Sequence, residues 1–435
     1  MAADQRAGGA RQIFVPGVGQ YENIGDIILR RELIAWLQPL GRLHVYVGPS
    51  PEGYAESLGL GPDAVLYRSF RAYYTAALKQ AWAGRADYVF KPGEIQLTLV
   101  GMKEHLSVLP MLLAIRARLG RVARVGSGAR NFAPLPRLLI TPSILLSQLV
   151  AWRDPKTAAY LRRGEVMPDL AFAKDGGGAD GPRDVVVVSM RGDRPEPSQA
   201  WVDGVAAYAR EAGQRLVVVT QVFMDRDRSR DLAARLGAEL LDWDGEDHGA
   251  QEDRLRALYQ RTSLVVSDRL HVLICAVTEG ALPLALLVDG SDKIDRHFVA
   301  AGMAGVAVSS AGLDAAQVTA ALADAAAQGP RRAAELDGAN RWKQFRYIIF
   351  PGIRRIIGLS FILAVAGSLS VFEIPFIMTG GANGTTTFVI QTVQTAFQYH
   401  NVGLASAMAV VLLIIVLIVT WVQRRFFPDE KVDLA

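Results

Sequence analysis

The segment Ser267-Asp-Arg-Leu-His271 places a guanidinium and an imidazole two residues apart. It follows the apolar run Leu264–Val266 and precedes the apolar run Val272–Val277, which predicts a junction between a strand and a helix. Free N–H groups at the start of a helix attract anions, and an imidazole exchanges protons near neutral pH. Arg269 and His271 therefore suit a phosphate or carboxylate substrate that also needs a proton. The alternative is that His271 only caps or packs the helix.

A further guanidinium follows another predicted strand. Arg191 comes two residues after the run Asp184–Ser189. Its planar fork fits the oxygens of a carboxylate or a phosphate, so it is a candidate anion clamp. The alternative is an ordinary surface arginine after a strand.

Near the N-terminus, Asn23-Ile-Gly-Asp26 lies between a predicted strand and a predicted helix. An Asn or Asp at this position is most often a helix cap. The functional interpretation is a polar loop that faces substrate, with Asn23 and Gly25 as contacts and Asp26 as a base.

Lys293 and His297 lie four residues apart, and hence on one side of a helix. Lys293 is a candidate substrate contact, although a solvated helix face is the simpler interpretation of the pair and the one that the spacing favours. No Cys/His cluster has the spacing of zinc ligands, so no metal is expected.

Short apolar strands alternate with amphipathic helices around these residues, and this rhythm predicts mostly parallel, doubly wound sheets. The expected helices run from about Asp26 to Leu40, from about Pro134 onward and from about Asp314 to Ala327. The expected strands are Gln12–Val18, Leu43–Val47, Ala64–Tyr67, Asp87–Phe90, Val122–Val125, Asp184–Ser189, Arg215–Thr220, Ser263–Ser267 and Leu284–Val288.

The fold class expected is α/β, with two Rossmann-like domains at residues 1–174 and 183–330. The Gly-rich run 175–182 reads as their linker. Open α/β sheets bind ligands at the carboxyl ends of their strands, so the site is expected in a cleft between the two domains.

Residues 331–435 form a third, all-α part. Ile356 to Val422 contains one formally charged residue, Glu373, in 67 positions. This predicts a hairpin of two transmembrane helices, Ile356–Met378 and Leu404–Val422. Arginines flank both ends of the pair and the intervening loop has none, which places both tail ends and the soluble domains on the cytoplasmic side of the inner membrane.

Composition excludes several other classes. A net charge of +4, with bases and acids intermixed, argues against nucleic-acid binding. The lone cysteine, Cys275, lies in an apolar run and cannot form an internal disulfide. The N-terminal residues lack the apolar core of a signal peptide, so the first domain is expected to stay in the cytosol.

Over residues 11–325 the chain resembles the polysaccharide pyruvyl transferase family, which is similar in architecture to the two-domain GT-B glycosyltransferases. The segments that carry the resemblance are Asn23–Asp26, Arg153-Asp154, Val166–Phe172, Ser189–Arg191, Ser267–Ala276, Gly280 and Pro283. Members transfer pyruvate from phosphoenolpyruvate onto two hydroxyls of a sugar, which forms a cyclic ketal and releases phosphate.

The resemblance implies that Arg191 and Arg269 hold the carboxylate and phosphate of phosphoenolpyruvate and that His271 is the acid/base. Phosphoenolpyruvate would be the donor substrate, and no cofactor is implied. The segment Phe90-Lys-Pro-Gly-Glu94 departs from the family, which usually has a Gly-rich stretch here. That departure concerns the contacts to the acceptor.

Over residues 333–428 the tail resembles the end of a sugar-type ABC transporter permease subunit. The cytoplasmic coupling loop of that family, which docks onto an ATPase, is matched by Ala333, Ala334, Asp337, Gly338 and Pro351, with Arg332 and Phe350 replacing a Glu and a Leu. The tail supplies only the last two spans of such a permease, so a gene fusion is the simplest explanation.

Three hypotheses follow. The first is a pyruvyl transferase tethered to the membrane, acting on a sugar or a lipid-linked sugar in cell-surface polysaccharide synthesis. The second is a truncated sugar transport component that contacts an ABC ATPase and a partner permease. The third is a nonfunctional fusion. The first is favoured because its pair of domains is complete.

Overall fold

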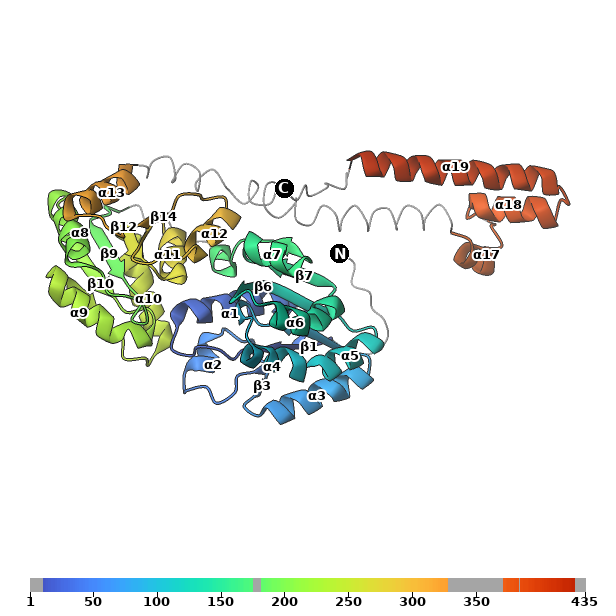
Figure 1. Cartoon of the computed structure of the whole chain (residues 1–435). Coiled ribbons are helices and arrows are strands. Elements are labelled where there is room, and N and C mark those ends of the chain that lie inside the picture. The colour runs from blue at the N-terminus through green and yellow to red at the C-terminus, as the bar shows by residue number, and fades with distance from the viewer. Residues whose placement is uncertain (1–10, 175–180, 328–370, 383, 427–435) are drawn as a thin grey trace. The chain divides into compact units, whose positions relative to one another are not determined.

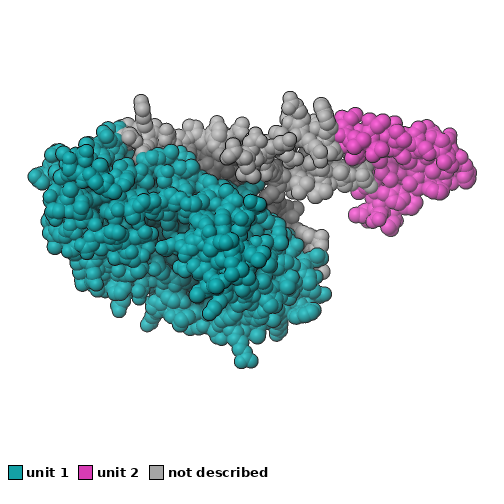
Figure 2. Space-filling view, viewed as in Figure 1, with its two compact units in different colours: residues 1–336 teal, residues 337–435 magenta. Residues whose placement is uncertain are grey.

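The computed structural model describes residues 11–174, 181–327, 371–382 and 384–426, with side chains described as far as residue 418. The chain forms two compact units, residues 1–336 and residues 337–435 (Figures 1 and 2). The first unit contains both β-sheets, and the described part of the second unit is helical.

The N-terminal sheet is parallel throughout, in the order β3-β2-β1-β4-β6-β7-β8, with β5 pairing to β6. Its strands are β1 (Gln12–Pro16), β2 (Arg42–Tyr46), β3 (Val65–Tyr67), β4 (Ala86–Phe90), β5 (Gly93–Gln96), β6 (Val122–Arg130), β7 (Leu149–Trp152) and β8 (Glu165–Val166). The order reverses between β1 and β4, which creates a crevice at the carboxyl ends of these two strands.

Helices cover both faces of this sheet (Figure 1). They are α1 (Ile24–Leu37), α2 (Tyr54–Ser57), α3 (Phe70–Trp82), α4 (Leu99–Ser107), α5 (Leu109–Ala117), α6 (Pro134–Leu146) and α7 (Pro155–Leu161), with 3-10 turns η1 (Gln38–Leu40) and η2 (Leu170–Ala173). Because successive strand side chains alternate between faces, Ile13 and Val15 pack with α1, whereas Phe14 packs with α3 and α5.

The second sheet has the order β11-β10-β9-β12-β13-β14 and is also parallel. Its strands are β9 (Val185–Ser189), β10 (Arg215–Val219), β11 (Glu239–Leu241), β12 (Thr262–Ser267), β13 (Leu282–Leu287) and β14 (Ala307–Ser309). Its helical elements are α8 (Gln199–Glu211), η3 (Phe223–Asp225), α9 (Arg226–Leu236), α10 (His248–Gln260), α11 (Leu270–Thr278), α12 (Lys293–Ala300) and α13 (Ala315–Ala327).

The central strand β9 explains why the sequence folds this way. All five of its residues, Val-Val-Val-Val-Ser, are buried. A strand covered by helices on both sides must be apolar on both sides, and such continuous runs are typical of parallel sheets. The switch in strand order lies between β9 and β12, the two strands that precede Arg191 and Arg269.

Eight of the nine expected strands are present within two residues of their predicted ends, and the α/β class with parallel sheets is confirmed. The ninth, expected at Val122–Val125, continues as β6 to Arg130. The helical region expected from Pro134 onward was wrong in part. It ends at Leu146, and the chain continues as β7, α7 and β8. The apolar run Leu149–Trp152 pairs with β6 instead of extending the helix.

The two sheets of the first unit are joined by backbone contacts beside the site. Asn23 forms an antiparallel bridge with Val222. The N–H of Ile24 donates to the carbonyl of Gln221 at 3.3 Å, and the N–H of Phe223 donates to Glu22 at 3.1 Å. Arg31 on α1 adds an ion pair with Glu252 on α10 at 2.6 Å. The start of α1 is therefore fixed against the loop that follows β10.

The described part of the second unit contains α17 (Glu373–Thr379), α18 (Phe388–Phe397) and α19 (Val402–Phe426), and α18 packs against α19. Helix α18 occupies what was expected to be a loop. Most of the first predicted span, 356–370, and the coupling-loop residues Ala333, Ala334, Asp337, Gly338 and Pro351 lie outside the described residues. Over the part of the chain that the structure describes, no helix has both the length and the apolar character that a membrane crossing requires.

Candidate active site

A cleft of ≈ 440 Å³ lies in the first unit, where the carboxyl ends of strands from both sheets meet. Six of the seven residues predicted from the sequence to form a substrate site line it: Asn23, Asp26, Arg191, Arg269, His271 and Lys293. The seventh, Gly25, packs beneath it. These residues are separated by as many as 270 positions along the chain, and the fold brings them together at one opening.

The imidazole of His271 lies between two carboxylates. Its Nδ1 is 3.8 Å from Oδ1 of Asp26 and its Nε2 is 3.7 Å from Oδ2 of Asp169. His271 is the second residue of α11, which begins directly after the loop that follows β12. A ring protonated on both nitrogens therefore has a carboxylate facing each N–H, which suits an acid that must be recharged after each turnover.

Asp169 is fully buried and holds Arg153 as well as facing His271. Nη1 of Arg153 donates to Oδ2 of Asp169 at 2.9 Å. Burial alone would raise the pKa of Asp169, but the imidazole of His271 and the guanidinium of Arg153 outweigh it and hold the pKa well below its usual range. Asp169 is therefore an ionised carboxylate behind the histidine.

Gly25 allows α1 to approach the histidine closely. A Cβ atom at Gly25 would lie 2.2 Å from Cβ and 2.6 Å from Cγ of His271. No side chain fits in that space, so the role of Gly25 is to allow contact between α1 and α11 rather than to touch substrate.

Asn23 performs the capping role that its position suggested. Its side-chain oxygen accepts from the N–H of Asp26 at 3.3 Å, and its amide donates to Gln20 at 2.9 Å. Asp26 is in turn held by Arg30, whose Nη2 lies 3.2 Å from Oδ2. Capping and function coincide here, because the cap fixes the carboxylate that faces His271.

Arg191 follows β9 and reaches into the cleft with its guanidinium already paired. Nε and Nη2 donate to the two carboxylate oxygens of Asp193 at 2.8 and 2.7 Å. Those hydrogen bonds lower the pKa of Asp193 to about 2. An incoming anion must therefore share or displace Asp193 to gain the planar fork.

Arg269 is held more deeply. Its Nε donates to Oδ2 of Asp225 at 2.6 Å, and Nη2 binds the other oxygen of this buried carboxylate. Asp225 also accepts from the N–H of Gly192 at 2.8 Å, so it links the loops that follow β9 and β12. Asp225 therefore holds both Arg269 and the loop at Gly192 in place, where the strand order switches between β9 and β12.

Lys293 contacts the segment that departs from the family pattern. Its Nζ donates to Oε2 of Glu94 on β5 at 2.6 Å, across 199 residues. Burial would raise the pKa of Glu94, but Lys293, Arg153 and Arg130 lower it to about 2. Burial lowers the pKa of Lys293 despite its carboxylate partner, and Arg153 and Arg191 add to that shift. Positive charge around the pair lowers the pKa of Glu94, whereas burial is the main cause of the lowered pKa of Lys293.

The charges that line the cleft indicate which ligands it can bind. Its lining includes seven basic side chains and three carboxylates. The basic ones are Arg30, Lys91, Arg130, Arg153, Arg191, Arg269 and Lys293. Such a concentration of fixed cations around one histidine favours a small, multiply charged anion.

Sequence reasoning missed the carboxylates that organise these cations, namely Glu94, Asp169, Asp193 and Asp225, and it gave Arg153 no role. Arg153 and Asp169 do lie within segments that carry the family resemblance, so that signal was available. Asp225 lies in a stretch where acids and bases alternate, which gave no sign that the structure buries it. His297, the neighbour of Lys293, is also buried, with Nδ1 2.6 Å from the Lys293 carbonyl oxygen, so this is not a solvated helix face.

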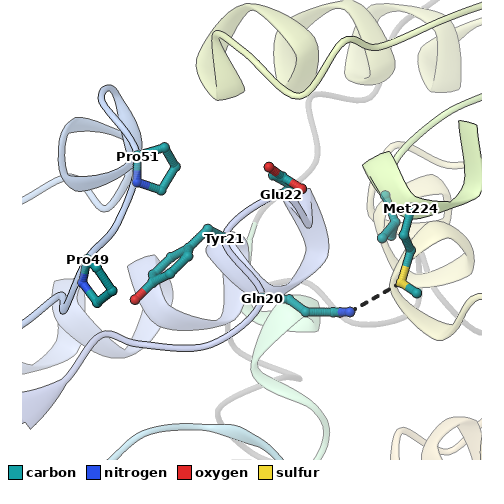
Figure 3. A pocket seen from close by; sticks show the side chains of 7 residues that line it. Gln20, Tyr21, Glu22, Pro49, Pro51 and Met224 are labelled. Carbon is teal, nitrogen blue, oxygen red and sulfur yellow. Dashed lines mark hydrogen bonds between the residues drawn. The ribbon is translucent and has the colours of Figure 1, made fainter.

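A second hollow of ≈ 390 Å³ adjoins the cleft (Figure 3). Its lining is Gln20, Tyr21, Glu22, Pro49, Pro51, Val222 and Met224, of which Gln20, Val222 and Met224 also line the cleft. The amide of Gln20 contacts the sulfur of Met224 at 3.3 Å on the shared wall. No base lines this hollow, so its chemistry differs from that of the cationic cleft.

The fold is that of an α/β protein with two parallel sheets and a cleft between them. A crystal structure of UDP-GlcNAc 2-epimerase from Neisseria meningitidis bound to UDP-GlcNAc has a TM-score of 0.50 to this chain at 12% identity. The matched region covers 74% of this chain and 93% of the epimerase. At that identity the likeness shows a shared GT-B-like fold.

The family model for polysaccharide pyruvyl transferase matches residues 23–281, which is more than half of the chain. The match begins at Asn23 and includes every predicted site residue except Lys293. The chain therefore belongs to the polysaccharide pyruvyl transferase family.

The C-terminal part matches a second family model, the binding-protein-dependent transport system inner membrane component, over residues 271–432. The probable ABC transporter permease YurN of Bacillus subtilis is 37% identical over 101 residues, covering 23% of this chain and 35% of the permease. The osmoprotective compounds uptake permease GgtC of Synechocystis is 39% identical over 100 residues, covering 23% and 36%. The chain spans about a third of the length of these relatives, and the expected resemblance of its two parts to two different families is confirmed.

Proposed function

We propose that this protein transfers pyruvate from phosphoenolpyruvate onto two hydroxyls of a sugar in the synthesis of a cell-surface polysaccharide. The observation that carries the proposal is the position of His271, between Asp26 and Asp169, in a cleft lined by seven basic side chains. Phosphoenolpyruvate is a small trianion that must accept a proton at carbon, and this combination supplies both needs.

His271 gives its proton to the methylene carbon of phosphoenolpyruvate, which leaves an oxocarbenium-like centre at the neighbouring carbon. A sugar hydroxyl adds at that carbon and gives its proton to the imidazole of His271. The carboxylate of Asp26 faces the imidazole and stabilises its protonated form. The bond from that carbon to the phosphate oxygen then breaks, and the second hydroxyl completes the ketal. The proton of this second hydroxyl leaves with the phosphate, so the reaction is balanced without a cofactor.

Arg191 and Arg269 are assigned to the carboxylate and phosphate of the donor. Arg269 is fixed by the buried Asp225, so it offers a preorganised charge rather than a mobile one. Lys293 on α12, whose partner Glu94 lies on β5 of the other sheet, is assigned to the donor as well. The hollow beside Tyr21 is left for the sugar, because it adjoins the cleft and its lining has one carboxylate, Glu22, and no base.

A membrane location belongs to the same proposal. The match to an inner-membrane component supports association of the tail with the cytoplasmic membrane. We assign a hairpin with both ends on the cytoplasmic side, which would keep the enzyme near a lipid-linked acceptor and raise its local concentration.

The permease match favours one other candidate, a transport component that contacts an ABC ATPase and a partner permease through its coupling loop. Co-purification of an ATPase that is lost on Gly338→Asp would support it. Absence of any ATPase from wild-type and variant preparations alike would remove it.

Phosphate release by the purified full chain tests the enzymatic proposal. We expect release from phosphoenolpyruvate that depends on an added sugar, and loss of turnover in His271→Ala with an unchanged thermal unfolding midpoint. His400→Ala, outside the first unit, serves as the control and should leave turnover unchanged. Equal release by wild type and His271→Ala would remove the histidine from the mechanism.

A further inference from the structure

Three neighbouring helices of the N-terminal sheet expose large apolar side chains to solvent. Helix α6 packs against α4 and α5, and all three lie on one side of the sheet (Figure 1). Seven large aliphatic side chains on their outer surface are between 39% and 73% exposed: Leu99, Val100, Leu106, Leu113, Leu135, Leu138 and Leu145. We call this surface the α4–α6 face.

Helix α6 shows that this exposure follows a pattern. Leu135, Leu138 and Leu145 recur at spacings of three and seven residues, so they form one stripe along the helix. The opposite side of the same helix buries Ile140 and Ile144 against the core. A helix that is apolar on both sides is typical of an environment without water on its outer side.

The charges around this face have one sign. Residues 95–152 contain seven arginines and lysines and a single acid, Glu104. That acid is already paired, because its carboxylate accepts from Lys91 at 2.8 Å. Lys103 and Arg118 are exposed among the apolar side chains. Apolar stripes interleaved with bases are typical of surfaces that lie in the interface of an anionic bilayer.

The face also borders the cleft. Helix α4 begins three residues after the end of β5, and Gly93, Glu94 and Gln96 of β5 line the cleft. Lys91 lines the cleft too and makes its ion pair with Glu104 on α4. A bilayer seated on α4 would therefore lie next to the opening of the site.

We propose that the α4–α6 face docks on the surface of an anionic lipid bilayer and presents the cleft to acceptors held in that bilayer. The catalytic unit then contacts the membrane itself, independently of the C-terminal tail. The docking rests on exposure and charge alone, and only its purpose rests on the proposed pyruvyl transfer.

Charge argues against two other occupants. A second copy of the face would bring the exposed Lys103 and Arg118 against the same two bases, which is repulsive. Helix α19 of this chain has no Asp or Glu to offer the bases. A bilayer that contains phosphatidylglycerol supplies both the negative charge and the apolar interior that this face requires.

The test places a fluorescent label on the face of the full chain. Cys275 is buried, so a thiol-reactive label attaches to an introduced cysteine. Leu138→Cys puts the label on the outer stripe of α6, and Leu240→Cys, on β11 of the other sheet, is the matched control. Both proteins are mixed with vesicles of phosphatidylethanolamine and phosphatidylglycerol that contain a doxyl-labelled lipid as quencher.

We expect quenching at position 138 to be several-fold greater than at position 240. The Lys103→Glu, Arg118→Glu double variant and vesicles without phosphatidylglycerol should each reduce it several-fold. Equal quenching at both positions would show that only the tail binds, and would overturn the proposal. A change at position 138 that depends on protein concentration but not on lipid would indicate self-association, and would overturn it as well.

The same preparations separate this proposal from the enzymatic one. Quenching without phosphate release would leave the docking intact and refute the pyruvyl transfer. Phosphate release with a soluble sugar, without quenching, would support the pyruvyl transfer and refute the docking.

Discussion

Gly25 and His271 touch across the junction of the two sheets, so closely that a Cβ on the glycine would lie 2.2 Å from the Cβ of the histidine. The start of α1 and the start of α11 thus form one packed unit beneath the cleft. The position of the imidazole between its carboxylates depends on that contact, and the first prediction follows from it.

Gly25→Ala should move His271 away from Asp26 and Asp169. The clash involves Cβ and Cγ, which cannot swing aside as the end of a flexible side chain can. We expect phosphate release to fall by roughly 10-fold or more, because misplacement of about an ångström has that effect on a positioned group. Gly290→Ala, where a Cβ meets open space, should retain wild-type turnover. Wild-type turnover in Gly25→Ala would refute the packing argument.

Asp169→Asn should destabilise the fold as well as slow the reaction. It leaves Arg153 buried without its carboxylate, and breaking a buried pair costs roughly 3–5 kcal/mol. Urea unfolding of the full chain measures this. The control is Glu239→Gln, which removes the exposed partner of Arg215 and should cost much less, because water screens an exposed pair. Similar losses in the two variants would mean that the buried pair contributes little.

Asp193→Asn should tighten the binding of phosphoenolpyruvate. The carboxylate of Asp193 occupies both donor positions of the Arg191 fork, and an anionic ligand must compete with it. Removing its charge should lower the dissociation constant several-fold, as measured by calorimetric titration. Asp203→Asn, on the outer side of α8, provides the comparison. Weaker binding in Asp193→Asn would show instead that the carboxylate preorganises the arginine for its ligand.

Asp268→Asn should change how stability depends on pH. Burial raises the pKa of Asp268 to about 6, although the Arg191 N–H and the charges of Arg269 and Arg191 oppose it. Between pH 4 and pH 6 the folded protein therefore binds more protons at this group than the unfolded chain does. Stability from this group is present below pH 4 and is lost as pH rises through 6.

The Asp268→Asn variant has no carboxyl to titrate at this position, so it does not lose stability in this way as the pH rises. Its stability relative to wild type should improve by roughly 1–3 kcal/mol between pH 4 and pH 7. Chemical unfolding at the two pH values measures the difference. A constant difference would mean that the carboxyl of Asp268 is not perturbed in the folded state.

The strands and their carboxyl ends could be predicted because burial on both faces demands long apolar runs. Val185–Ser189 and Thr262–Ser267 are such runs, and they fixed the positions of Arg191 and Arg269. The short strands β11 and β14 were missed because none of their residues is fully buried, so they lack a long apolar run. Strand β7 was missed because its apolar run follows α6 without a turn signal.

The ion pairs of the site could not be predicted in the same way. Asp169 is 102 residues from His271, Asp225 is 44 from Arg269, and Glu94 is 199 from Lys293. Spacing along a chain reports on neighbours within one helix or strand. Pairs between separate elements depend on how the sheets pack, which no local pattern contains.

Product analysis tests the central proposal most directly. The full chain is incubated in D₂O with phosphoenolpyruvate and a panel of methyl glucoside, methyl galactoside and methyl mannoside, and the products are examined by mass spectrometry. Protonation of the methylene carbon by His271 predicts a pyruvate ketal whose methyl group carries one deuterium, with one phosphate released for each ketal. Phosphate release without a ketal, or no consumption of phosphoenolpyruvate by a folded protein with any of these sugars, would contradict it.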